Sequence, residues 1–231
     1  MSRKLLRPVG SPTPRDAMTS RKQERRDLER IDALKGHEQT DPYHLAKLKE
    51  EILKDGHQHD PITIDAKTNV ILDGHHRAEI FKALNLSLIA VYRVDYDSPE
   101  ILVQAWLPAF NAGPQAVANA LGLSIGTGPV ESKAEITLVW DGGEQELPLT
   151  RTQVMDLLVG RFPITYVRDE REARALIQSG RAKAFLVLPT VSKEDVIRSA
   201  LSGNKLPPKT TRHVFPEEPR PVFVPLDDLS R

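Results

Sequence analysis

The chain has no cysteine among its 231 residues. This absence excludes disulfide scaffolds, thiolate metal sites, iron–sulfur clusters and every reaction that needs a cysteine nucleophile. The chain also lacks net charge, because 32 Lys and Arg residues balance 32 Asp and Glu residues. A neutral molecule has no overall field that attracts a polyanion, so a role centred on nucleic acid is not favoured.

Long apolar runs are missing as well. No segment reaches the length of a membrane span, and the first residues are charged where a signal peptide needs an apolar stretch. We therefore expect a cytoplasmic protein that does not associate with membranes. The glycine-rich phosphate loop GxxxxGK(S/T) is missing too, so a bound nucleotide would need another phosphate-binding structure.

The composition that remains is that of a globular protein, with 39% hydrophobic and 28% charged residues. Proline, glycine and charge patterns suggest four parts. We expect a basic, flexible extension over residues 1–30, with a short charged run at its end that could be helical. A nucleotide-binding domain over 31–113 and a smaller α/β domain over 114–205 would follow, and then a substrate-binding loop and tail over 206–231.

The first domain is predicted to alternate strands and helices. Asp41 and Pro42 begin a helix that closes at Gly56. Short β-branched runs at 61–64 and 70–72 predict two strands, and the second runs into a helix that ends at Asn85. With a further strand over 88–94, this order indicates an α/β fold with a strand-to-helix turn in its middle.

The second half shows similar signals. A hairpin is predicted around Asp141-Gly142-Gly143, and Pro108 is expected to end the apolar segment before it. The remaining elements are helices over 114–121, 150–159, 169–179 and 192–202 and a strand over 184–188.

The strongest chemical motif is Asp73-Gly74-His75-His76-Arg77, where a strand meets a helix. A helix N-terminus offers unpaired N–H groups, glycine lets an anion approach the backbone, and His and Arg add donors. The motif therefore predicts a phosphate-binding turn. The simpler alternative is that Asp73 only caps the helix and the histidines decorate a solvated surface.

A metal site is a further alternative. His57, His59 and Asp60 could join His75 and His76 around an ion. The missing thiolates and the nearby arginine argue against zinc, and magnesium carried by a nucleotide is the favoured metal.

Three other features could serve the same chemistry. Glu38 precedes the first helix and could act as a general base at the edge of a phosphate site. The segment KTTRH at 209–213 could bind a carboxylate or a phosphate. Trp106, in the segment AWLPAF, is either a core aromatic or a pocket wall.

These motifs together resemble a known family. DGHHR after a strand is similar to the phosphate-binding turn of the ParB/sulfiredoxin superfamily. In order along the chain, KGHEQ, VILDGHHRAEIFKAL, VYRVDY, QAWLPAF and PPKTTRHVFP resemble the free L-serine kinases of that superfamily, in particular the ADP-dependent type. The similarity extends from about residue 35 to 216, and the basic extension has no match.

The resemblance implies a ParB/sulfiredoxin-like domain, a second domain and an active-site cleft between them. It implies a kinase that transfers phosphate from ADP or ATP to the hydroxyl of L-serine, giving O-phospho-L-serine for cysteine or serine metabolism. The catalytic residues would be Glu38 as general base and Asp73 near the transferred phosphate or its Mg²⁺. Phosphate would be bound by 73–77, and serine by Trp106, Thr211, Arg212 and His213.

Three other functions are alternatives to a serine kinase. A ParB-like nucleotide-dependent DNA-binding protein or nuclease shares the central turn, but the neutral charge and the hairpin that follows do not favour it. A serine- or nucleotide-sensing regulator is the second, and the presence of Glu38 argues against it. Sulfiredoxin-like repair needs a cysteine and is excluded. Oligomeric state is left open.

Overall fold

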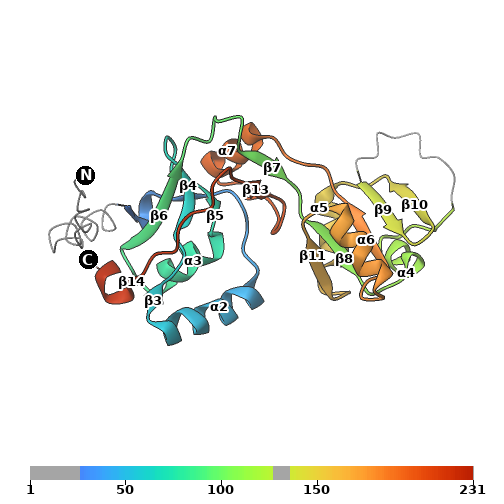
Figure 1. Ribbon diagram of the computed structural model, residues 1–231. Coiled ribbons are helices and arrows are strands. Elements are labelled where there is room, and N and C mark those ends of the chain that lie inside the picture. Colours follow the sequence, from blue (N-terminus) through green and yellow to red (C-terminus); the bar gives the residue numbers. More distant parts are fainter. Residues whose placement is uncertain (1–26, 127–135, 231) are drawn as a thin grey trace, which may run out of the picture.

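The computed structural model describes residues 27–126 and 136–230, and within them it has two five-stranded sheets (Figure 1). The end of the expected extension differs from the prediction. Leu28–Arg30 is not helical but forms strand β1, which pairs antiparallel with β6 (Leu88–Val94). Residues 1–26 lie outside the described part of the chain.

The first sheet has the order β1-β6-β4-β5-β2, with β4 (Ile62–Asp65), β5 (Val70–Asp73) and β2 (Lys35–Gly36). One face is covered by α2 (Pro42–Asp55) and α3 (His75–Ala83) over a core that contains Phe81. A 3₁₀ turn, η1 (Ile31–Ala33), adds Ile31 to this core. The predictions for β4, β5, β6, α2 and α3 are confirmed, whereas β1, β2 and η1 were not predicted.

The helix boundaries follow the local chemistry. Asp41 caps α2 by accepting from the Tyr43 N–H at 2.9 Å, and Gly56 ends that helix in the left-handed region. Asn85 follows α3 with a φ of 56°, which is the left-handed conformation that its position predicted.

The second sheet has the order β10-β9-β12-β8-β11. Its strands are β8 (Leu107–Phe110), β9 (Ile136–Trp140), β10 (Gly143–Leu147), β11 (Ile164–Val167) and β12 (Ala184–Val187). The helices α4 (Pro114–Ala120) and α5 (Arg151–Leu158) pack on one face, and α6 (Glu170–Gln178) packs on the other. The hairpin and these helices were predicted, whereas β11 was not.

Pro108 does not end the apolar segment as expected, since it lies inside β8, opposite Tyr166 of β11. Pairing of β8 with β12 is confined to Ala109 and Phe110. A proline can stay in this strand because it lies beyond the β12 contacts, where its missing N–H interrupts no ladder on that side.

Two elements pack with the sheet on the other side of the domain boundary expected at residue 113. Strand β8 belongs to the second sheet, and α7 (Lys193–Ser202) packs with Val196 and Ala200 against the second face of the first sheet. The chain thus crosses between the two sheets twice. The ribbon of β7 (Leu102–Gln104) and β13 (Arg212–Val214) lies along these crossings.

The C-terminal segment returns to the first sheet. Strand β14 (Val224–Pro225) pairs with β3 (His57–Gln58), and the turn η2 (Leu226–Leu229) buries Leu229 in the first core. Among the described helices, none is long and apolar enough to cross a membrane.

Candidate active site

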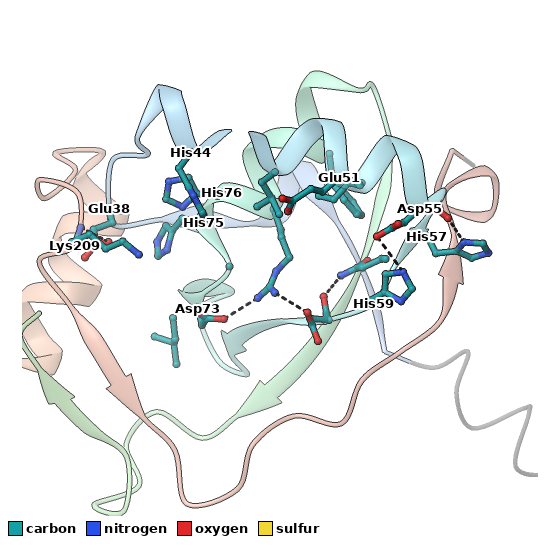
Figure 2. Close-up of a pocket in the computed structure, with 18 of the residues that line it drawn as sticks. Glu38, His44, Glu51, Asp55, His57, His59, Asp73, His75, His76 and Lys209 are labelled. Carbon is teal, nitrogen blue, oxygen red and sulfur yellow. Dashed lines mark hydrogen bonds and ion pairs between the residues drawn. The ribbon is translucent and has the colours of Figure 1, made fainter. Parts of the chain in front are cut away.

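A pocket of about 400 Å³ lies on the first sheet, where α2, α3 and the 209–211 loop meet (Figure 2). Glu38 and Lys209 lie at one end of the view, and Asp55, His57 and His59 lie at the other. Seven of the predicted site residues line it: Glu38, Asp73, Gly74, His75, His76, Arg77 and Trp106. Thr211 is an eighth, whereas Arg212 and His213 do not belong to the lining.

The strand-to-helix turn depends on Gly74. This residue has a φ of 97°, and an added Cβ would lie 2.5 Å from Ile62 Cγ2. Only glycine fits both the backbone conformation and the space. Gly74 is itself the N-cap of α3 and makes no side-chain cap bond, so the alternative that Asp73 merely caps the helix is wrong.

Asp73 and Arg77 form the charged pair of this turn. Arg77 Nη2 donates to Asp73 Oδ2 at 2.8 Å, and its Nη1 lies 3.8 Å from Asp60. The Asp73 side chain is 63% exposed, whereas that of Arg77 is 21% exposed. A solvated carboxylate beside a fixed guanidinium and a helix N-terminus can take part in binding a phosphate with its cation.

The two histidines of the turn are held as neutral rings. His75 Nε2 accepts from the backbone N–H of His37 at 3.3 Å, and His76 Nε2 accepts from the Asp41 N–H at 3.1 Å. Burial lowers the pKa of His75 well below its ordinary value and that of His76 to about 4. With Nε2 accepting, the ring proton of each lies on Nδ1, so they can offer neutral donors rather than positive charge.

Glu38 is a buried carboxylate held by the C-terminal loop. The N–H of Thr211 donates to Oε1 at 2.6 Å, its hydroxyl lies 2.8 Å from the same oxygen, and the Lys209 N–H donates to Oε2 at 3.2 Å. The loop is fixed here because residues 37–39 pair with Leu206, through Leu206 N–H to His37 O at 2.8 Å and Gln39 N–H to Leu206 O at 2.9 Å. Burial raises the pKa of Glu38, against the opposing hydrogen bonds from Thr211 and Lys209. A desolvated carboxylate with raised proton affinity suits a general base.

The side chains of residues 209–213 contact different partners. Arg212 donates to Gln104 across the β7–β13 ribbon, and its guanidinium lies 6.0 Å from the Trp106 ring. Lys209 Nζ lies 5.2 Å from the same ring. His213 turns inward, where Nε2 is 2.8 Å from the Tyr96 hydroxyl, and burial lowers its pKa to about 3. Two cationic groups, those of Lys209 and Arg212, thus lie within 6.0 Å of the Trp106 ring, which lines the same pocket as Glu38.

The pooled histidine metal site does not form among the described residues, since no group of three or more His, Asp or Glu side chains there could hold an ion. His57 and His59 lie at the end of the pocket away from Glu38, and Phe223 stacks on His57 at 4.0 Å between ring centroids. The pocket lining also includes the apolar side chains of Leu48, Ile52 and Phe81.

Two other side chains near Glu38 come from the second sheet and its helix. Arg151, at the start of α5, donates to the Pro189 carbonyl at 2.5 Å. Burial lowers the pKa of Arg151 against the opposing charge of Glu38, and burial raises the pKa of Tyr166 to about 12. Sequence reasoning did not single out Arg151, Tyr166 or His44, of which His44 lines the pocket. It gave Lys209 no role of its own, although this residue lies inside the KTTRH motif.

Comparison with known proteins agrees with this geometry, although no family model matches the chain. The chain is 27% identical to an ATP-dependent L-serine kinase of Desulfurococcus mucosus over 86% of this chain and 89% of that protein. It is equally 27% identical to an ADP-dependent L-serine kinase of Thermococcus kodakarensis, over 86% and 90%. A ParB-like protein of Sulfolobus acidocaldarius is 27% identical over 71% of this chain and 78% of that one.

Solved structures agree with the sequence comparison. A free serine kinase in complex with AMP matches with a TM-score of 0.74 and 25% identity, over 87% of this chain and 92% of that one. A mutant free serine kinase in complex with ADP matches over the same fractions with a TM-score of 0.75 and 26% identity. The chain therefore resembles free L-serine kinases, both ATP- and ADP-dependent, in sequence and in its mixed α/β fold.

Proposed function

We propose that this protein is a kinase of free L-serine. It transfers a phosphoryl group from a nucleotide to the serine hydroxyl and yields O-phospho-L-serine. The observation that carries the proposal is one pocket that joins a buried carboxylate, Glu38, to a strand-to-helix turn suited to phosphate, at 73–77. A base and a phosphate site facing one cavity are the two parts that phosphoryl transfer to an alcohol requires.

The step can be written atom by atom. The serine hydroxyl oxygen attacks the terminal phosphorus, and its proton passes to the Glu38 carboxylate. The bond between that phosphorus and the bridging oxygen breaks, and the shortened nucleotide leaves with the electron pair. The N–H groups at the start of α3 and the Arg77 guanidinium stabilise the charge on the phosphoryl oxygens.

Magnesium fits this turn through one carboxylate. Asp73 is exposed toward solvent, and Mg²⁺ usually takes one or two protein carboxylates together with substrate phosphates. Asp73 would hold the ion, which supplies neutralisation of phosphate charge when bound.

The amino-acid substrate would lie beside Trp106. Serine is a small zwitterion, and its carboxylate needs a cationic partner. Arg212 and Lys209 both approach the Trp106 ring and can supply that charge. Thr211 and His213 already contact Glu38 and Tyr96, so their part in serine recognition would be to shape and position the site.

We propose ADP as the donor, which the similar structure bound to ADP supports. The ATP-dependent relative is as similar in sequence as the ADP-dependent one, so ATP is the alternative that the experiment must decide. Both nucleotides would place their terminal phosphate at the same turn.

The test is a phosphorus NMR assay of the purified protein with Mg²⁺, L-serine and either ADP or ATP. O-phospho-L-serine should form with one donor. The nucleotide product, AMP from ADP or ADP from ATP, shows that the terminal phosphate moved. L-alanine is the matched control because it lacks only the hydroxyl. Binding of nucleotide without a phosphorylated product from either donor would overturn the kinase and favour a sensor or a ParB-like switch, and DNA binding would then be measured.

A further inference from the structure

His37, the neighbour of Glu38, is a fully buried histidine with both ring nitrogens engaged. Nδ1 lies 2.8 Å from the carbonyl oxygen of Ile71, and Nε2 lies 2.9 Å from Thr211 Oγ1. The same Thr211 oxygen lies 2.8 Å from Glu38 Oε1. One hydroxyl therefore links a buried imidazole to the proposed general base.

The position of each proton can be worked out along the hydrogen bonds from the Ile71 carbonyl through His37 and Thr211 to Glu38. A carbonyl oxygen only accepts, so His37 must carry a proton on Nδ1. Burial lowers the pKa of His37 to about 4, which keeps the ring neutral and leaves Nε2 as an acceptor. Both neighbours of Thr211 Oγ1 then accept when Glu38 is ionised, yet the hydroxyl has a single proton.

The two protonation states of Glu38 therefore use the hydroxyl differently. With Glu38 ionised, the hydroxyl donates to the carboxylate and leaves His37 Nε2 without that bond. With a proton on Oε1, Glu38 donates to Thr211, and Thr211 donates to His37. His37 Nε2 then keeps its hydrogen-bond donor, which matters because unpaired buried acceptors are costly.

We propose that the Thr211 hydroxyl switches between Glu38 and His37 during turnover, so that His37 stabilises the protonated form of the general base. His37 is then a positioning residue that strengthens Glu38 as a proton acceptor without touching the substrate. The proton taken from serine stays on Glu38, and no net proton moves to the imidazole. The inference rests on the proposed function, since it assigns a device to the base of that reaction.

Other titratable groups surround the hydrogen bonds that link His37, Thr211 and Glu38. The His75 and His213 rings lie 4.5 and 5.7 Å from that of His37, and both are kept neutral by burial. Lys209 and Arg151 act on Glu38 with positive charge, which favours the carboxylate. Tyr166 faces the same carboxyl from β11. The two cations favour the ionised form of Glu38. The switch favours the protonated form, because it adds a hydrogen bond to that form alone.

The first experiment needs no catalysis and uses the unaltered protein. Nitrogen-15 NMR of labelled histidine reports on His37 Nε2 while pH is varied. We expect a neutral ring with its proton on Nδ1, and an Nε2 signal that shifts as Glu38 gains a proton. The Glu38→Gln protein should lack that step. A His37 ring that carries its proton on Nε2, or whose signal does not follow Glu38, would overturn the proposal.

The second experiment separates positioning from simple structural support. His37→Asn can still donate to the Ile71 carbonyl but has no acceptor near Thr211, whereas the longer amide of His37→Gln can supply one. The acidic limb of the kcat/KM profile should move down by about one pH unit in His37→Asn, the size of one lost hydrogen bond. His37→Gln should restore much of that shift.

Equal losses in both variants at every pH, with an unmoved limb, would show that His37 only supports the fold. If the unaltered protein forms no O-phosphoserine, the proposed function fails, and the NMR titration still decides whether the switch exists. The two failures are thus distinguishable.

Discussion

Glu38 and Asp73 are carboxylates that line the same pocket in opposite environments. Glu38 is 9% exposed and accepts hydrogen bonds from two backbone N–H groups of the 209–211 loop, whereas the Asp73 side chain is 63% exposed and has Arg77 as its partner. Burial raises proton affinity and fixes geometry, while solvent lets a carboxylate stay ionised beside a cation. In the proposed reaction, this difference would place proton transfer at the buried Glu38 and charge neutralisation at the exposed Asp73.

The ends also differ in how the chain builds them. The Asp73 end comes from five consecutive residues, 73–77. The Glu38 end needs residue 211, which is 173 positions away. If the two ends act separately, a change at one end should leave the function of the other intact.

Glu38→Gln should lower turnover by roughly a hundredfold or more, since it removes the proposed general base. Nucleotide affinity should stay within about twofold, because the phosphate turn is untouched. Steady-state kinetics and calorimetric nucleotide titration measure the two effects. Glu50→Gln, an exposed position on α2, is the matched control. An equal loss of nucleotide affinity in Glu38→Gln would mean that the two ends are one unit.

Gly74→Ala should destabilise the protein by about 3 kcal/mol, because strain in the left-handed region adds to overlap with Ile62. Gly56→Ala is the control, since Gly56 also has a positive φ but has no atom within 4 Å of the added Cβ. It should cost about 1 kcal/mol. Denaturant unfolding measures both, and equal costs would show that the close contact with Ile62 is unimportant.

Lowering the pH should lower the unfolding free energy, because His37 is buried beside Glu38. The folded pKa of His37 is about 4, below its ordinary value of 6.5, so the unfolded chain binds a proton that the folded chain refuses. The unfolding free energy should fall by roughly 2 kcal/mol between pH 8 and pH 5 from this residue. Glu38 acts in the opposite sense, because its raised pKa favours the folded state at low pH and costs stability once it ionises.

Unfolding across this pH range measures the effect. His37→Gln should remove only the His37 share of the acid loss, about 2 kcal/mol, because burial also lowers the pKa of His75, His76 and His213. His59→Gln, at an exposed position, should leave the loss intact. If His37→Gln loses as much stability in acid as the unaltered protein, His37 does not contribute to the acid loss.

Arg212→Ala should raise the KM for serine by about tenfold and leave that for nucleotide within twofold, because its proposed partner is the amino-acid carboxylate. Arg198→Ala, which removes an exposed arginine of α7, is the control. An effect confined to nucleotide would assign the 209–213 loop to the phosphate end.

Local chemistry explains the elements that sequence reasoning predicted. Caps formed within a few residues set the helix ends. Asp41 and Gly56 cap the two ends of α2, and Ser192 and Asp195 form the capping box that begins α7. Strand β11 was missed, although Ile164–Val167 is β-branched and aromatic, because its short run follows Pro163 directly. Strand β1 was missed because its three residues follow a charged run and are held by β6, far along the chain.

The same division holds for the site. The sequence determined the strand-to-helix turn at 73–77, the caps, the alternation of elements and the chemistry offered by Glu38, since these depend on neighbours a few positions apart. Only the tertiary structure decided that Thr211 contacts Glu38 and His37, that His213 turns toward Tyr96, and that α7 packs on the first sheet. Burial and proton affinity depend on atoms brought together by distant segments, and a linear pattern does not record those distances.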